Sequence, residues 1–186
     1  MTLKRRILTG WLIALGLGTP SIASAQNDWR VLTNGAVVLF RHALAPGTAD
    51  PPGFRLNDCR TQRNLNAEGR AQARRIGEAF RARRVTVTRV LTSQWCRARE
   101  TAMLAFPGVA RDEAAFNSFF GDSEREAGQT SAARGVLSRW NGPGVLVVMT
   151  HQVNITALTG IVPASGEGVI VRFEDGRLKV LGRVTP

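Results

Sequence analysis

The chain contains two histidines, and each follows directly after a short apolar run. His42 comes after one such run and Arg41, and His151 comes after another run later in the chain. Imidazole can act as a nucleophile or move protons, and guanidinium groups bind phosphate and carboxylate through their fork of donors. A lone histidine in such a place is more often structural, but two in equivalent places indicate one shared site.

The apolar runs predict the strands that would position these histidines. The runs 36–40 and 145–149 are continuous and rich in β-branched residues, and glycine-containing turn signals precede them, which is typical of buried strands. The segment 85–92 predicts a further strand between them. In an open α/β sheet, ligands bind outside the carboxyl ends of the strands. Both histidines fall at such ends, so the sequence predicts a site there.

Helical patterns alternate with these strands. Asn66 is a good N-cap for an amphipathic helix that continues to about Arg83. A second helix is predicted over 95–106, where a proline-glycine pair follows, and a third over about 131–140. A short helix is expected after the second histidine. The segment 43–63 is rich in proline and glycine and has no sustained period, so it predicts a long loop, a kind that is often functional.

The carboxyl-terminal tail has the pattern of a β-hairpin. Segments 169–173 and 178–184 read as strands around the tight-turn pair Asp175-Gly176. Alternating strands and helices favour a mostly parallel sheet that is covered on both faces. The predicted fold is therefore a three-layer α/β sandwich, with a mostly parallel central sheet, helices on both faces and the hairpin added at an edge.

Four short blocks, in the same order, resemble a known family. Arg41-His42-Ala43 resembles the Arg-His-Gly signature of the histidine phosphatase superfamily, which includes phosphoglycerate mutases and phosphohistidine phosphatases. The block 93–102 is similar to the family's Ser-x-x-x-Arg-Ala-x-x-Thr-Ala pattern, and the block 65–73 is similar to its Leu-Thr-x-x-Gly-x-x-Gln-Ala pattern. Thr150-His151, after a predicted buried strand, resembles the second catalytic histidine.

The resemblance implies a phosphoryl-transfer site. Arg41 and Arg97 would bind the phosphoryl oxygens, because a nucleophile cannot approach this charged group without neutralisation. A neutral His42 would attack phosphorus to form a phosphohistidine, and His151 would donate to an oxygen of the transferring group. Water would then hydrolyse the intermediate. No cofactor is implied, and two histidines without neighbouring carboxylate or thiolate ligands make a poor metal site.

The sequence departs from the family pattern in the group that should protonate the leaving oxygen. Many members carry a glutamate there, but the closest alignment places Asn117 or Ser118 at that position. Asp122 is the preferred substitute, with Glu124 as the alternative. Without any such acid, the enzyme would resemble the phosphohistidine phosphatases, whose leaving groups need little protonation. The missing glutamate and Ala43 in place of glycine also leave open a phosphate-binding pseudoenzyme without turnover.

The two cysteines, Cys59 and Cys96, are expected to form a disulfide. Cys96 adjoins Arg97, and Cys59 lies in the long loop after the predicted strand 36–40. A bridge would therefore fasten this loop to the phosphate site. An even number of cysteines favours a bridge in a protein that is exported, and the amino-terminal pattern described next predicts export. Two separate buried thiols are the alternative.

The amino terminus has the pattern of a secretory signal peptide. Lys4, Arg5 and Arg6 precede an apolar run, and Ala23-Ser24-Ala25 is a typical cleavage pattern. The run is shorter than the roughly 20 residues of a spanning helix. We therefore expect a signal peptide over residues 1–25, one domain over 26–186, a periplasmic or secreted location and no stable membrane anchor.

The composition suits an anionic substrate. The formal net charge is +11, and most of the positive charge is arginine. No aromatic-studded basic strand, zinc pattern or helix-turn-helix spacing favours nucleic acid. The expected substrate is a phosphomonoester such as an envelope glycan phosphate, by analogy with exported heptose phosphatases of the superfamily. A mutase is disfavoured because the chain is short. The sequence leaves the oligomeric state open.

Overall fold

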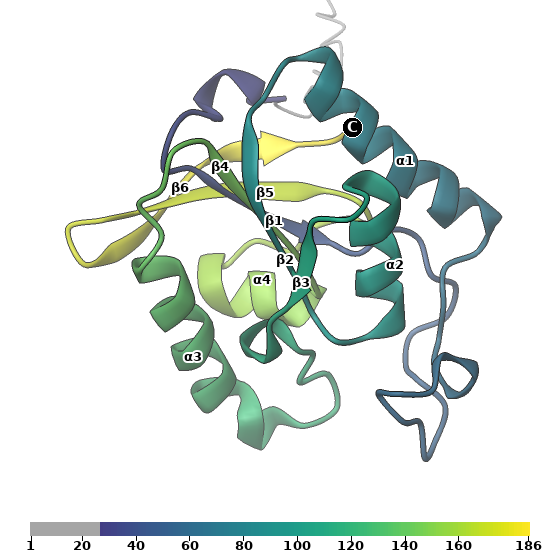
Figure 1. Ribbon diagram of the computed structural model, residues 1–186. Coiled ribbons are helices and arrows are strands. Elements are labelled where there is room, and N and C mark those ends of the chain that lie inside the picture. Colours follow the sequence, from purple (N-terminus) through teal and green to yellow (C-terminus); the bar gives the residue numbers. More distant parts are fainter. Residues whose placement is uncertain (1–26) are drawn as a thin grey trace, which may run out of the picture.

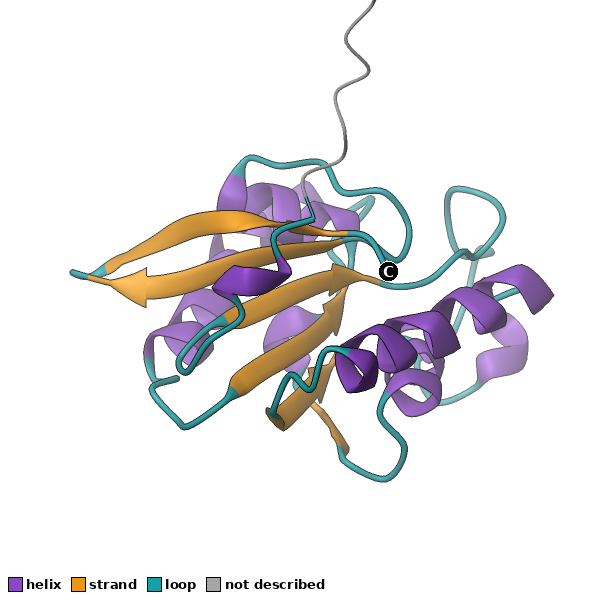
Figure 2. Ribbon diagram, turned by 90° about the horizontal axis from the view of Figure 1, so that it is seen from above, coloured by secondary structure: helices purple, strands orange, loops and turns teal. Residues whose placement is uncertain are grey.

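The predicted strands form the centre of one six-stranded sheet in the computed structural model, which describes residues 27–186. The predicted signal peptide over residues 1–25 lies outside these described residues. The strand order is β3-β2-β4-β1-β5-β6, with bounds β1 (Val37–Arg41), β2 (Val87–Thr92), β3 (Ala110–Asp112), β4 (Val145–Thr150), β5 (Gly168–Glu174) and β6 (Arg177–Val184). Strands β1 to β4 are parallel. The antiparallel β5–β6 hairpin extends the sheet beyond β1, as predicted (Figure 2).

Helices cover both faces of the sheet, which confirms the three-layer sandwich (Figure 1). The helices α1 (Ala67–Ala82) and α2 (Cys96–Ala105) pack on one face, and α3 (Glu126–Ser138) and α4 (Gln152–Thr159) pack on the other. Residues alternate along β1, so that Val38 and Phe40 join the first core and Val37 and Leu39 the second. Within residues 27–186, no helix is long and apolar enough to cross a membrane.

A cap residue and a glycine in α1 determine where this helix begins and how closely it packs against α2. Asn66 caps α1 as predicted, because its side chain accepts a hydrogen bond from the Gly69 N–H at 2.7 Å. Gly77 lies against the end of α2, where a Cβ atom would come within 2.1 Å of the Ala105 carbonyl oxygen. Glycine therefore allows the close approach of the two helices. This packing holds the helix whose first turn carries Arg97.

The region between β2 and β4 differs most from the sequence prediction. The helix expected over about 131–140 begins at Glu126, after a 3₁₀ turn over Ser123–Arg125, and ends at Ser138. Glu124 and Glu126 lie in the first turns, where acidic groups favour the helix dipole. The short edge strand β3 was not predicted. Its pairing with β2, rather than any pattern of its own, makes it a strand.

Candidate active site

The parallel strands deliver both histidines to one edge of the sheet. β4 lies between β1 and β2, and His42, His151 and Ser93 follow directly after β1, β4 and β2. The two imidazole rings are 5.4 Å apart between centroids and meet edge to face. Both histidines are buried. The structure thus brings together two side chains separated by more than a hundred residues of sequence.

Arg97 joins the two histidines. It lies in the first turn of α2 and is buried. Its Nε donates to His42 Nε2 at 3.2 Å, and its Nη2 lies 3.5 Å from His151 Nδ1. Its Nη1 donates to both carboxylate oxygens of Asp50, at 2.8 and 3.0 Å. Burial lowers the pKa of Arg97 to about 10, although Asp50 opposes this shift, so the guanidinium stays charged at neutral pH.

The hydrogen bonds of His42 determine which of its nitrogens is free to react. Because Arg97 donates to Nε2, this nitrogen is unprotonated, and the proton is on Nδ1. The Nδ1–H donates to the carbonyl oxygen of Ala43 at 2.8 Å. Burial, followed by the charge of Arg97, lowers the pKa of His42 to about 3. At neutral pH the ring is therefore uncharged, with the lone pair of Nε2 directed toward the arginine that would hold an anion.

His151 is held by a chain of hydrogen bonds that ends at Asn117. Its Nε2 lies 2.8 Å from the Ser93 hydroxyl, which in turn donates to the side-chain oxygen of Asn117 at 3.3 Å. Asn117 also bonds the backbone and the side chain of Gln94. Burial and the charge of Arg97 keep the pKa of His151 well below its ordinary value. Asn117, at one of the positions aligned with the family's glutamate, thus supports His151 through Ser93.

Ala43 fits the site without strain. Its N–H donates to the Thr101 hydroxyl at 3.0 Å, and its side chain is fully buried. Among the described residues, the only non-glycine positions with positive φ are Arg84 and Asp175. The backbone at Ala43 therefore has a conformation that an alanine adopts readily.

A cavity of about 240 Å³, which we call the active-site cavity, opens beside these groups. Its walls include Arg41, His42, Arg97 and His151, together with Asp50 and Arg63 from the long loop and the aromatic rings of Phe54, Trp95 and Phe120. Arg41 and Arg63 each have a buried Nε without a hydrogen-bond partner among the described residues. A bound anion would satisfy such donors. The family resemblance indicates Arg41, whereas no motif in the sequence indicates Arg63.

Asp50 is an acidic cavity residue that no sequence motif indicates. Besides its bonds to Arg97, its carboxylate accepts the Trp95 indole N–H and the Arg63 backbone N–H, each at 2.9 Å. Burial alone would raise the pKa of Asp50, but the Arg63 N–H bond and the charge of Arg97 outweigh it, and the pKa lies below its ordinary value. Asp50 is therefore ionised in the unliganded site. The surrounding loop has no periodic pattern that would have singled it out.

The structure places the predicted acids outside the cavity. Asp122 has a half-exposed carboxylate that lies 4.0 Å from Arg125 Nε, and it is not among the cavity residues. Glu124 is exposed and is also absent from the cavity. Ser118, Phe120 and Gly121, which precede them in the chain, do line it. The geometry therefore gives no contact through which Asp122 would reach the two histidines.

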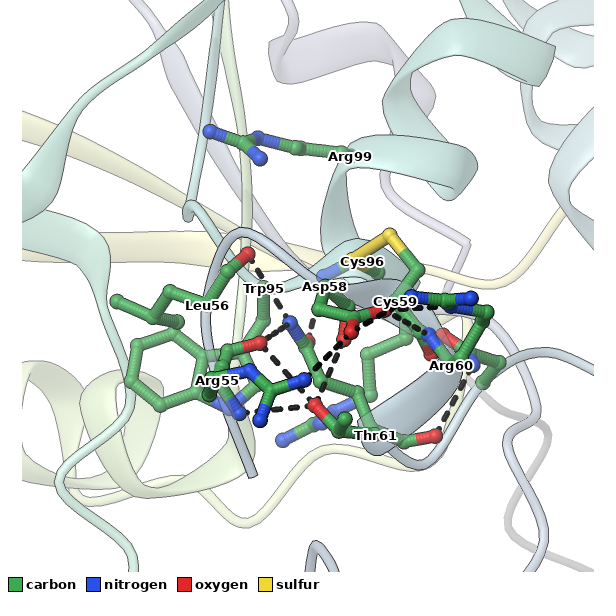
Figure 3. Close-up of a disulfide and its surroundings, with 12 residues drawn as sticks. Arg55, Leu56, Asp58, Cys59, Arg60, Thr61, Trp95, Cys96 and Arg99 are labelled. Atoms are coloured by element: carbon green, nitrogen blue, oxygen red, sulfur yellow. Dashed lines mark hydrogen bonds and ion pairs between the residues drawn. A yellow bond between two sulfur atoms is a disulfide. The ribbon is translucent and has the colours of Figure 1, made fainter. Parts of the chain in front are cut away.

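A disulfide joins Cys59 to Cys96, as expected (Figure 3). The two Cα atoms are 5.6 Å apart. The bridge fastens the long loop to the residue next to Arg97, and Gln62 adds a second link by accepting the Cys96 N–H at 3.0 Å. Within the described residues, no group of three or more metal-ligating side chains occurs.

Comparison with known proteins identifies relatives of this fold. The sequence model of the histidine phosphatase superfamily (branch 1) matches residues 37–112. No curated protein matches the chain. The product of open reading frame Rv3214 from Mycobacterium tuberculosis has a TM-score of 0.61 at 14% identity, covering 81% of this chain and 97% of that chain. A mycobacterial glucosyl-3-phosphoglycerate phosphatase gives 0.57 at 16%, with 78% and 96% covered. The protein histidine phosphatase SixA, complexed with tungstate, gives 0.56 at 18%, with 81% and 97% covered.

Proposed function

Because residues 37–112 match the sequence model of the histidine phosphatase superfamily, we propose that the chain is a member of this superfamily and hydrolyses phosphomonoesters through a phosphorylated His42. The observation that carries this proposal is the state of His42. Its ring is neutral, its Nδ1–H is bonded to Ala43, and its unprotonated Nε2 accepts a hydrogen bond from Arg97 Nε at 3.2 Å. A neutral imidazole with a fixed tautomer next to an anion-binding guanidinium is suited to attack phosphorus.

The surrounding residues suit the two halves of the reaction. Arg41, Arg63 and Arg97 supply the positive charge that a phosphoryl group needs when a nucleophile approaches. The negative charge of the bound phosphoryl group opposes the effects that keep His151 neutral, so His151 can take up a proton and donate to a phosphoryl oxygen. His42 releases the phosphoryl group when water attacks the intermediate. Because both histidines are buried, access of bulk water to the phosphorylated intermediate is limited.

Trapping the intermediate tests this proposal. The mature protein is mixed with dinitrophenyl phosphate, quenched within milliseconds in alkaline denaturant and digested for mass spectrometry. We expect one phosphoryl group on the peptide that contains His42, and we expect mild acid to remove it, because phosphohistidine is acid-labile. The His42→Asn variant should carry no label. Hydrolysis without a label on His42, or an acid-stable label elsewhere, would contradict the proposal. Binding of phosphate without any hydrolysis would favour the pseudoenzyme.

The substrate that we propose is a phosphorylated glycan of the cell envelope. Phe54, Trp95 and Phe120 give the cavity flat apolar walls, and Phe120 is 58% exposed. Aromatic faces of this kind pack against the apolar face of a sugar ring. The mycobacterial glucosyl-3-phosphoglycerate phosphatase, which shares the fold, is named for a sugar-containing phosphate.

We also propose that the protein is exported. The signal-peptide pattern supports export, and the disulfide supports an oxidising compartment, where such bonds persist. Sequencing the amino terminus of the protein recovered from a periplasmic fraction or culture medium checks this proposal. The mature chain is expected to begin at Gln26, after cleavage behind Ala25. Recovery of the intact chain from the cytoplasm, with both cysteines as thiols, would contradict it.

A further inference from the structure

We propose that Asp50 is the proton donor to the leaving group, a role that rests on the proposed phosphatase function. Asp50 is the only carboxylate among the described residues that line the active-site cavity. Asp122 and Glu124 do not line it. A phosphomonoester of an ordinary alcohol needs a proton on its leaving oxygen, because an alkoxide leaves poorly. If this site supplies that proton from an acid, the structure leaves Asp50 as the carboxylate within reach.

The arrangement around Arg97 places Asp50 across from the nucleophile. Two corners of the planar guanidinium, Nε and Nη2, face His42 and His151, and the third corner, Nη1, faces Asp50. The carboxylate and the histidine pair therefore lie on opposite sides of one guanidinium group. In a phosphoryl transfer the attacking and leaving oxygen or nitrogen atoms are roughly in line on opposite sides of phosphorus. A phosphoryl group held by Arg97 and attacked by His42 can thus direct its leaving oxygen toward Asp50.

Substrate binding would change the protonation of Asp50. In the unliganded site Arg97, Trp95 and the Arg63 backbone hold it as a carboxylate. The phosphoryl group competes for Arg97 and brings further negative charge into a cavity whose other charged groups are Arg41 and Arg63. A negative charge held close to a carboxylate, together with competition for its cationic partner, raises the pKa of that carboxylate. Asp50 would therefore become protonated from solvent as the substrate binds.

The proton then follows a balanced path. In the first step the His42 Nε2–P bond forms, the P–O bond to the leaving group breaks, and the Asp50 carboxyl transfers its proton to that oxygen, which leaves as an alcohol. In the second step water attacks the phosphohistidine, the Asp50 carboxylate accepts a proton from this water, and the N–P bond breaks. When inorganic phosphate departs, Asp50 loses its proton and returns to Arg97. The net reaction is ester plus water giving alcohol plus phosphate.

The dependence of the rate on the leaving group tests Asp50. The Asp50→Asn variant removes the transferable proton but keeps side-chain oxygen and nitrogen atoms near Arg97 and Trp95. We expect its kcat/KM for a simple alkyl phosphate to fall about a hundredfold or more, as general acids contribute at least this factor. For dinitrophenyl phosphate, whose leaving group needs no proton, the loss should be at least about tenfold smaller. Rates are measured on a series of aryl phosphates between these two extremes.

The pattern of losses distinguishes this role from its alternatives. If Asp50 only positions Arg97, the Asp50→Asn variant loses the same factor on every substrate, which would overturn the proposal. The proposal is also overturned if kcat/KM depends more strongly on the leaving group in the Asp122→Asn variant but not in the Asp50→Asn variant. Thermal unfolding shows that the compared variants are folded. The failure of the proposed function is separate, because it would appear in the unchanged protein as the absence of a phosphohistidine.

Discussion

An Arg97→Lys variant is expected to lose about a thousandfold in kcat/KM toward dinitrophenyl phosphate while the protein stays folded. The three nitrogens of the guanidinium contact three different groups, His42, His151 and Asp50. A lysine ammonium is a compact charge that cannot reproduce this planar fork. Lysine keeps the positive charge, so the buried carboxylate of Asp50 is not left without a cationic partner. The loss in kcat/KM therefore measures the contribution of the guanidinium's donor geometry more than that of its positive charge.

Arg99 provides a matched control for this substitution. It lies on α2 two residues after Arg97, but its side chain points away from the disulfide (Figure 3). Its guanidinium pairs with Asp112. The Arg99→Lys variant should retain wild-type kcat/KM, because exposed ion pairs of this kind contribute little. Steady-state kinetics and the affinity for vanadate are measured on both variants. Equal activity of Arg97→Lys and the wild type would show that Arg97 does not hold the phosphoryl group.

The parts of the fold that could be predicted are those with local signals. The apolar run of β4 becomes a fully buried strand, and Asn66 caps α1 where its side chain predicts a cap. The edge strand β3 has only three residues, too few to show a pattern, and it depends on its pairing with β2. The start of α3 could not be read because a 3₁₀ turn leads into it without a side-chain cap.

The same distinction applies to the site. His42 and His151 could be found because each directly follows a strand, and the end of a parallel strand fixes where its next residue lies. Asp50 is 47 positions before Arg97 in the sequence and meets it through an irregular loop. Its position in the cavity depends on long-range contacts that no local pattern encodes. The alignment therefore favours Asp122, a few residues after Ser118, whereas the carboxylate that lines the cavity is Asp50, from the loop after β1.

Removal of the disulfide is expected to lower the free energy of unfolding by about 3–4 kcal/mol. The bridge joins residues 37 positions apart. A cross-link over this length lowers the conformational entropy of the unfolded chain, which stabilises the fold by about this free energy. Cys59 is exposed and Cys96 is buried, so serine is a mild change at the first position and leaves a buried hydroxyl at the second. The Cys59→Ser variant therefore gives the cleanest measure of the bridge. Urea unfolding at neutral pH, with and without reductant, supplies the free energies.

The single and double serine variants together separate the bridge from the packing of the two side chains. If the stabilisation comes from the covalent link, Cys59→Ser removes all of it. Adding Cys96→Ser then lowers the free energy of unfolding only slightly further, because it buries a hydroxyl. Reductant should bring the wild type to the stability of Cys59→Ser and leave that variant unchanged. Additive losses, or a wild type that reductant does not affect, would mean that the thiols act separately. Activity is expected to fall less than in Arg97→Lys, because the bonds of Asp50 to Arg97 and of Gln62 to Cys96 still hold the loop against α2.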